Sequence, residues 1–512
     1  MDFEESTHKI VSQEFLAVII AGFGNELTPL TSNHGEKANP KALLPIANKP
    51  MLTHPLMWLE ASDIRDVLLI CPAPHRSAIS HFLHSDSSAF PSLRIDLQAY
   101  DETQDLSVGT CTVLKHFSSK IKQDFLILPC DFVPHPSVPL TRLLNKFRTE
   151  TTYDGSIATA FFFEPRRAEK GSVPDEWGIE NTTLPVMWDE KSGTLLYVDT
   201  PDEVDKNGEL LEVNMSLLSR YPRAKLSAGL QDSHVYICRR AVLDLLQEKP
   251  RFESIREELI PWLCTLQYHG GKRAKYQNAL SSITNTPSHA IALRHATLHD
   301  EVKLHFSQQE RYGFTHSAAS SQDEDGEVDV EIPTSLRVGV VVHRSSEGYS
   351  ARANNLHSYL ELNRHFLSQS SYTLPTDPES RALIDAKAQI SADSMVGHTT
   401  KVGERTTIKK SIIGKHCVIG KMARIVGCII FDHCVIADGV KLDGCILGTN
   451  TSVGVKAELS KCVTQAGYEI SAGESYRNEK LEVSDWTAPQ DSTDNTDEDD
   501  DEEDESDTSN ED

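Results

Sequence analysis

The sequence lacks paired cysteines, long apolar runs and a basic balance of charge. Its ten cysteines form no C-x-x-C pair, and Cys71, Cys130 and Cys238 lie in or at the ends of apolar runs, where a thiol is usually a small buried hydrophobe. We therefore expect no disulfide framework and a reducing compartment, the cytosol. The apolar runs, such as 15–21, are far shorter than a membrane span, and the acidic residues 1–5 do not resemble a signal segment.

The negative charge is concentrated at one end of the chain. Residues 491–512 contain fourteen Asp and Glu and no Lys or Arg, so subtracting them from the formal net charge of −26 leaves −12 for the rest. A mildly acidic body argues against nonspecific binding to nucleic acid or anionic lipid, and we expect neither nucleic acid nor a membrane as a partner. The acidic segment is predicted to be a disordered, solvated tail over 485–512.

Residues 14–310, after an expected N-terminal tail over 1–13, alternate short apolar runs with stretches of helical length. Apolar runs without polar alternation are typical of strands buried on both faces, as in a parallel sheet. This alternation predicts an α/β doubly wound domain. The expected strands are 15–20, 66–70, 125–128 and 156–163, and the expected helices are 51–61, 109–121 and 140–147.

A polar and acidic stretch at 317–330 follows this domain and predicts a disordered insert over 311–335. After it, residues 336–342 have the composition of a strand and residues 354–366 that of a helix. We assign both to a connector, 336–385, that leads to a second domain.

Residues 386–484 carry the most regular pattern in the sequence. Val396, Val402 and Ile408 are six residues apart, and similar aliphatic triplets begin 17, 34 and 51 residues after Val396. Steps of six, six and five residues make one turn of a three-sided coil with one aliphatic side chain on each side, so we predict a parallel β-helix of hexapeptide repeats.

Two other residue types keep this period. Cys428, Cys445 and Cys462 are 17 residues apart, and we interpret them as a packing column rather than a metal ladder, because their neighbours are aliphatic. Glycine follows an aliphatic residue at six places, where we expect it to form the corners of tight turns. These glycines are at positions 397, 403, 414, 420, 448 and 454.

A glycine-rich turn follows the first expected strand. Gly22 and Gly24 lie in the stretch 21–31, and a proline-rich block, 39–51, contains Lys41. Glycines after a buried strand let backbone amides approach phosphate oxygens, and a lysine supplies positive charge. The pattern predicts a phosphate-binding turn, with a plain tight turn as the alternative for the two glycines.

These motifs resemble those of the sugar-nucleotide pyrophosphorylases, whose nucleotidyltransferase domain opens with a Gly-Gly-x-Gly-Thr-Arg-Leu-x-Pro-Leu-Thr loop. Several members also carry a C-terminal left-handed β-helix, so the resemblance covers most of the chain and implies that hand for the second domain. It also implies roles for five residues: Lys41 as the lysine of the proline-rich block, Gly109 and Thr110 near base and sugar, and Asp131 and Asp232 as metal-binding aspartates.

One departure from the family motif bears on the chemistry. Glu26 stands where the family has an arginine that neutralises phosphate charge. Nucleotidyl transfer depends mainly on positioning and charge neutralisation, so this reversal costs on the order of several kcal/mol of transition-state stabilisation. We therefore predict a pseudo-enzyme with no catalytic residue, metal or cofactor, although the two aspartates leave weak binding of a magnesium-nucleotide open. An aspartate that caps a loop at a strand end is the alternative interpretation of Asp131. The degenerate site comprises Gly22, Gly24, Glu26, Lys41, Gly109, Thr110, Asp131 and Asp232.

Four segments resemble the gamma subunits of translation initiation factor 2B, which share this architecture with the epsilon subunits: 40–50, 232–238, 254–261 and 352–364. The resemblance implies a partner of the epsilon subunit, in a decamer with the other factor 2B subunits that releases GDP from initiation factor 2. Epsilon subunits end in a helical-repeat domain that carries the exchange activity. About fifty residues follow Leu459, so we expect no exchange by this chain alone.

Three alternatives stay open. An active mannose-1-phosphate guanylyltransferase would share the fold, and so would a noncatalytic regulatory subunit of such an enzyme. An acyltransferase would use the β-helix with a histidine base. His416 and His433 are 17 residues apart, and we interpret them as a surface ladder rather than a site.

Overall fold

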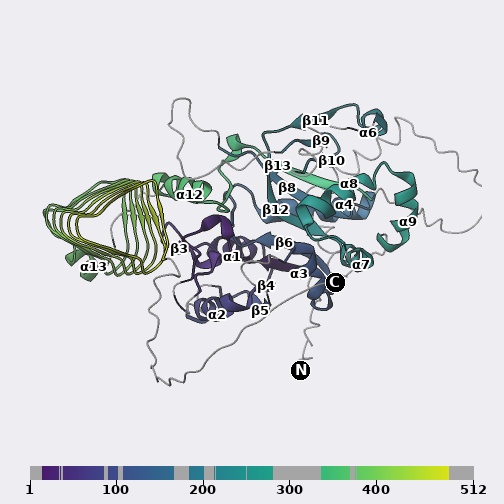
Figure 1. Cartoon of the computed structure of the whole chain (residues 1–512). Helices are drawn as coiled ribbons and strands as arrows, with labels where there is room; N and C mark the ends of the chain where they lie inside the picture. The colour runs from purple at the N-terminus through teal and green to yellow at the C-terminus, as the bar shows by residue number, and fades with distance from the viewer. Residues whose placement is uncertain are drawn as a thin grey trace, which may run out of the picture.

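The computed structural model of the chain shows an α/β domain and a separate coil of stacked strands, with helix α12 between them (Figure 1). The expected N-terminal tail, the acidic insert and the acidic tail lie outside the described residues, so these boundaries stay predictions. The structure describes residues 14–33, 35, 38–85, 90–101, 108–166, 184–200, 213, 215–249, 251–280, 336–369, 375 and 377–483.

The first domain is built on a ten-stranded mixed sheet in the order β11-β9-β10-β13-β8-β12-β6-β1-β4-β5. Strands β6, β1, β4 and β5 are parallel, as expected, and so are β8 and β13, but β12 runs antiparallel to both of its neighbours. The strands are β1 Phe15–Ile20, β4 Asp66–Pro72, β5 Arg94–Tyr100, β6 Asp124–Pro129, β8 Ala158–Phe163, β9 Val186–Asp189, β10 Thr194–Val198, β11 Ala224–Ser227, β12 Gln231–Cys238 and β13 Val338–His343.

Alternate side chains of the central strand β1 enter two apolar cores on opposite faces of the sheet. Val18 packs in a core covered by α3, α7 and α8, whereas Ala17 and Ile19 pack in a core covered by α1, α2 and α4. Helices on both faces make the domain doubly wound, as predicted. The helices are α1 Thr53–Glu60, α2 Arg76–Ser85, α3 Thr110–His116, α4 Leu140–Asp154, α6 Met215–Arg220, α7 Ala241–Glu248, α8 Ile260–Thr265 and α9 Gly270–Leu280.

Short elements complete the domain. They are the 3-10 helices η1 Asn25–Leu27, η2 Lys41–Leu43, η3 Ala73–His75, η4 Ser118–Lys120 and η6 Ser345–Glu347, the π-helix η5 Ile255–Leu259, and the strands β2 Pro45–Ile46, β3 Lys49–Pro50, β7 Phe132–Val133 and β14 Ala351–Arg352. Helices α12 Leu356–Gln369 and α13 Pro378–Ala382 follow. No helix within the described residues has both the length and the apolar character needed to cross a membrane.

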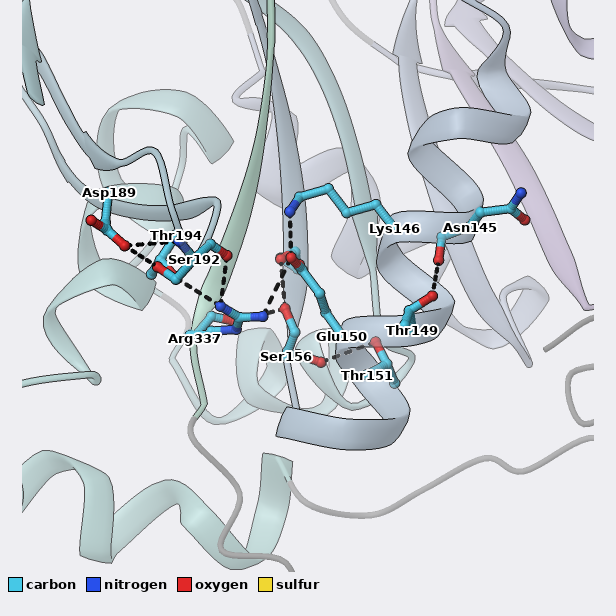
Figure 2. A network of polar contacts seen from close by, with 11 residues as sticks. Asn145, Lys146, Thr149, Glu150, Thr151, Ser156, Asp189, Ser192, Thr194 and Arg337 are labelled. Atoms are coloured by element: carbon cyan, nitrogen blue, oxygen red, sulfur yellow. Dashed lines mark hydrogen bonds and ion pairs between the residues drawn. The ribbon is translucent and has the colours of Figure 1, made fainter. Parts of the chain in front are cut away.

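The strand that we assigned to the connector, β13, is an internal strand of the large sheet, between β8 and β10. Arg337, which precedes it, forms an ion pair with the buried Glu150 of α4 (Nη2 to Oε1, 3.3 Å) and donates a hydrogen bond to Thr194 Oγ1 (2.8 Å). Lys146 pairs with the same carboxylate from one turn earlier in α4 (Figure 2). This polar cluster anchors β13, which follows β12 by a hundred residues. The local composition of β13 does not indicate this attachment.

The second domain consists of three parallel sheets of two- and three-residue strands, seen at the left of Figure 1. Partners such as Val396 and Ile413 are 17 residues apart, which confirms the predicted three-sided coil. The strands are β15 Gln389–Ile390, β16 Met395–Val396, β17 Lys401–Val402, β18 Thr407–Lys409, β19 Ile412–Ile413, β20 Val418–Ile419, β21 Arg424–Val426, β22 Ile429–Ile430, β23 Val435–Ile436, β24 Lys441–Asp443, β25 Ile446–Leu447, β26 Ser452–Val453, β27 Glu458–Ser460, β28 Val463–Thr464, β29 Glu469–Ile470, β30 Ser475–Arg477 and β31 Lys480–Leu481.

The six glycines predicted at the corners of the coil, those that follow an aliphatic residue, do not adopt a positive φ. A Cβ at Gly414 would lie 2.4 Å from Asp432 Oδ1 and 2.7 Å from the Asp432 amide nitrogen in the next turn of the coil. The left-handed conformation falls two residues later, on His416 (φ 56°), and the next turn repeats it at His433 (φ 61°). Glycine is therefore needed for the close approach of successive turns, not for a positive φ.

The stacked side chains of the coil agree with a packing role. The amide of Cys445 donates to Cys428 Sγ (3.4 Å), and the three column cysteines are buried. The rings of His416 and His433 stack on the surface with centroids 4.9 Å apart. Within the part of the chain that the structure describes, no group of three or more His, Cys, Asp and Glu has an arrangement suited to a metal ion.

Candidate functional site

The glycine-rich turn lies at the carboxyl end of β1, beside the carboxyl end of the parallel strand β6. Gly24 adopts φ 82°, and a Cβ there would lie 2.9 Å from Lys41 Cβ, so both its conformation and its contact with Lys41 require glycine. Thr31 Oγ1 donates to the Gly24 carbonyl (2.9 Å) and closes the turn. Gly22 has open space around its Cβ position and no positive φ, so neither its conformation nor a close contact requires glycine there.

A cavity of about 310 Å³ opens at this edge of the sheet. Six of the eight predicted site positions line it. Of the other two, Gly109 lies in the chain between the lining residues Val108 and Thr110, and Asp232 accepts hydrogen bonds from the lining residues Tyr236 and His234. The six are Gly22, Gly24, Glu26, Lys41, Thr110 and Asp131. A cavity at the carboxyl ends of parallel strands is where open α/β sheets bind ligands.

Asp131, which follows β6, has no exposed surface. Lys41 Nζ donates to its Oδ2 (2.5 Å), while Arg352 donates from Nε to Oδ1 and from Nη2 to Oδ2, both at 3.0 Å. Burial alone would raise the pKa of this carboxyl, but the Arg352 and Lys41 charges outweigh it and hold the pKa well below its usual range. The carboxylate is therefore ionised and fully paired with internal cations.

Asp232 lies in an irregular part of β12, where the register against β8 shifts between Asp232 and Val235 and His234 adopts φ 56°. Its carboxylate accepts hydrogen bonds from the Tyr236 hydroxyl and from the His234 amide (2.8 Å). Burial raises the pKa of Asp232, and these hydrogen bonds offset that effect only in part. Both carboxylate oxygens thus have partners inside the protein.

Gly109 and Thr110 hold the segment after α7 against the site. A Cβ at Gly109 would lie 2.4 Å from the Glu253 carbonyl oxygen, and the Ile255 amide donates to Thr110 Oγ1 (3.0 Å). Glycine is required here by close backbone approach. The contact places Ser254, Ile255 and Arg256 in the lining of the cavity.

Glu26 lies at the mouth of the cavity, in η1, with its side chain exposed. An exposed carboxylate at this place repels an anionic phosphate chain, whereas an arginine would attract it. Among the cavity-lining residues that the structure describes, the cationic side chains are Lys41, Arg256 and Arg352, and two of these are paired with Asp131.

The site is joined to the β-helix through α12. Asn354 accepts a hydrogen bond from Lys41 Nζ at its Oδ1 (2.7 Å), and one turn into the helix the Tyr359 hydroxyl donates to the Pro45 carbonyl. The Tyr359 ring meets Phe431 of the β-helix in an edge-to-face contact with centroids 6.4 Å apart. Asn48 Nδ2 donates to the Ile413 carbonyl (2.9 Å), so the proline-rich block contacts the β-helix directly.

Arg352, Asn354, Arg256 and Tyr236 were not predicted as site residues, although each lies in a segment that carries the sequence resemblance. Nothing in their local sequence indicates a cavity. The structure brings segments 232–238, 254–261 and 352–364 to the same edge of the sheet, next to the glycine-rich turn. These four residues could not be predicted as site residues without knowing that their segments meet in the fold.

Comparison with known families supports both domains. A nucleotidyl transferase model matches residues 16–171, and a model of the LbH domain of the eIF2B epsilon subunit matches residues 378–475. Fold and site together define a nucleotidyltransferase-like protein with a C-terminal left-handed β-helix.

Relatives of known function share most of the chain. The eIF2B gamma subunit of Schizosaccharomyces pombe is 33% identical over 91% of this chain and 90% of its own length. The gamma subunit of Dictyostelium discoideum is 26% identical over 73% of this chain and 81% of its own length. The epsilon subunit of Dictyostelium discoideum is 21% identical over 49% of this chain and 33% of its own length. The chain belongs to the family of gamma subunits of translation initiation factor eIF2B, and it is a member of that complex in translation initiation.

Proposed function

We propose that the chain supports guanine-nucleotide exchange on initiation factor 2 in the cytosol without nucleotidyl transfer of its own. Glu26 carries this proposal, because it places a negative charge at the mouth of the cavity where phosphate charge would have to be neutralised. The degenerate site residues then serve mainly to hold the turn, the proline-rich block and α12 together.

The proposed partners are the epsilon subunit and the other eIF2B subunits, in a decamer that binds initiation factor 2. One face of the β-helix is used internally, since Ile429, Phe431 and Ile446 pack against the first domain. Among the described residues, the sheet that contains β20 and β23 takes no part in that apolar contact, and it exposes Val418 and Val435 side by side. Rigid solenoid faces of this kind offer broad surfaces to partner proteins.

Release of labelled GDP from initiation factor 2 tests the exchange role. We expect no release above background with this chain alone, release with the epsilon subunit alone, and faster release with the two together. Glu26→Gln, an exposed change at the cavity mouth, should leave the combined rate unchanged. An accelerating effect of the chain in the absence of the epsilon subunit would refute the proposed division of roles.

Pyrophosphate release tests the absence of transfer chemistry. With GTP, mannose-1-phosphate and magnesium, we expect no pyrophosphate from the wild-type chain. Glu26→Arg serves as a matched variant that restores the family's charge at the same place. Turnover by the wild-type chain would show an active guanylyltransferase and would exclude the pseudo-enzyme interpretation.

A further inference from the structure

We propose that the guanidinium of Arg352 is a built-in cation that replaces a divalent metal ion at Asp131 and Asp232, and that this site does not bind such a metal. The family resemblance implies a metal at these two aspartates, but the residues present do not fit one. Metal binding by the chain alone is measured without nucleotide exchange. The absence of a metal site can therefore be disproved while the proposed function holds, and the proposed function can be disproved while the absence of a metal site holds.

The first reason is that both oxygens of Asp131 already accept hydrogen bonds from buried cations. Its Oδ1 accepts from Arg352 Nε, and its Oδ2 accepts from both Arg352 Nη2 and Lys41 Nζ. Two parallel N–H donors on one carboxylate form the bidentate geometry that arginine favours. A divalent ion would have to displace two buried cations from a carboxylate with no exposed surface.

The second reason is the arrangement of Asp232. Its oxygens accept from the Tyr236 hydroxyl and the His234 amide, and it is 5% exposed. Arg352 forms its ion pair with Asp131, and the charges of Asp131 and Asp232 both raise the pKa of Arg352 against the effect of its burial, so one guanidinium acts on a carboxylate after β6 and on one within β12. Magnesium prefers near-octahedral oxygen coordination with several waters, which this enclosed arrangement of donors does not offer.

The third reason is that the backbone places Arg352 in a defined position. Strand β14 pairs with β7 so that Arg352 lies opposite Phe132 and Ala351 opposite Val133. The Ala353 amide also donates to the Asp131 carbonyl (2.9 Å), which ties the arginine to the aspartate through main chain as well as side chain. An arginine stays charged at any pH that the fold survives, so the compensation is permanent.

Titration with Mn²⁺ followed by EPR of the free ion tests the proposal on the full-length chain. We expect wild type and Asp131→Asn to bind Mn²⁺ equally, because the weak binding that remains comes from the acidic residues at 491–512. Arg352→Gln should create a site at least about tenfold tighter than this background, and adding Asp131→Asn should remove it.

Arg337→Gln is the matched control, since it removes an arginine from a buried carboxylate, Glu150, that is not among the residues lining the cavity. We expect no gain of Mn²⁺ binding there. A wild-type site that Asp131→Asn abolishes would overturn the proposal, and so would a folded Arg352→Gln protein without the gain. If Arg352→Gln does not fold, wild type is compared with Asp131→Asn and Asp232→Asn: equal binding supports the proposal, and a loss in either variant overturns it.

Discussion

Asp131 and Glu150 are buried carboxylates in the same domain, and each is held between a lysine and an arginine. Lys41 and Arg352 hold Asp131. Lys146 and Arg337 hold Glu150 (Figure 2). The Asp131 cluster lines a cavity at the position where the family places a metal ion, whereas the Glu150 cluster joins α4 to the start of β13 away from it. Equal chemistry in two such different places shows that the identity of Asp131 does not by itself indicate a catalytic role.

The two clusters also differ in what they connect. The arginine of the Asp131 cluster comes from β14, directly before α12, which packs on the β-helix. The arginine of the Glu150 cluster stands before an internal strand of the sheet. A carboxylate between two cations can therefore serve as an attachment point for a segment from a distant part of the sequence, in one case at the domain junction and in the other within the sheet.

Removal of the central carboxylate charge should have the largest effect. Asp131→Asn leaves the cations of Lys41 and Arg352 without their counter-charge, and Glu150→Gln does the same to Arg337 and the partly exposed Lys146, so each should lower the stability of the first domain by about 3–5 kcal/mol. Urea unfolding followed by tryptophan fluorescence measures this loss. Asp63→Asn, in an exposed ion pair with Arg65, is the control and should change little. If only Glu150→Gln lowered the free energy of unfolding, the two clusters would not be equivalent, and Asp131 would be dispensable for the fold.

Removal of the arginines should cost less, about 2–3 kcal/mol, because each carboxylate keeps its lysine. The location of the effect should differ between the two variants. Arg337→Ala should raise amide hydrogen exchange mainly in β13, and Arg352→Ala mainly in β14 and α12, as measured by mass spectrometry of peptides. The same exchange pattern in both variants would contradict separate attachment points.

Removal of the lysines should separate the clusters by their exposure. Lys41 is 7% exposed and also donates to Asn354, whereas Lys146 is 20% exposed and more accessible to water. We expect Lys41→Met to cost about 2 kcal/mol and Lys146→Met about 1 kcal/mol or less, since solvent screens the second pair. Thermal unfolding of the two variants side by side checks the order. A larger loss of stability for Lys146→Met than for Lys41→Met would contradict the expected effect of burial.

Acid should reduce the difference in stability between wild type and Asp131→Asn. The pKa of Asp131 lies well below its usual range in the folded chain, because the Arg352 and Lys41 charges outweigh the effect of burial. Its contribution is therefore fully present above the pKa of an unfolded aspartate, about 3.9, and is lost as the pH falls through the folded value. Unfolding midpoints at pH 7, 5, 4 and 3 should show a constant difference down to about pH 4 and a smaller one below it. A difference that stays constant at pH 3 would contradict this linkage.

Sequence alone determined the features that depend on local order. The period of 17 residues predicted the three-sided coil because each turn of a β-helix repeats the same environment, and the residues after the first strand predicted the glycine-rich turn beside Lys41. It also placed Asp131 at a strand end, since continuous apolar runs mark buried strands.

The contacts that these residues make depend on the tertiary structure. Arg352 is 221 positions from Asp131, and the strand β13 joins a sheet whose other strands precede it by a hundred residues or more, so neither contact leaves a local pattern. The close approach of successive turns at Gly414, and the left-handed conformation of His416 two residues later, likewise depend on the packing of one turn against the next. Periodicity is a property of neighbours along the chain, whereas ion pairs of this kind form only after the sheet has brought distant segments together.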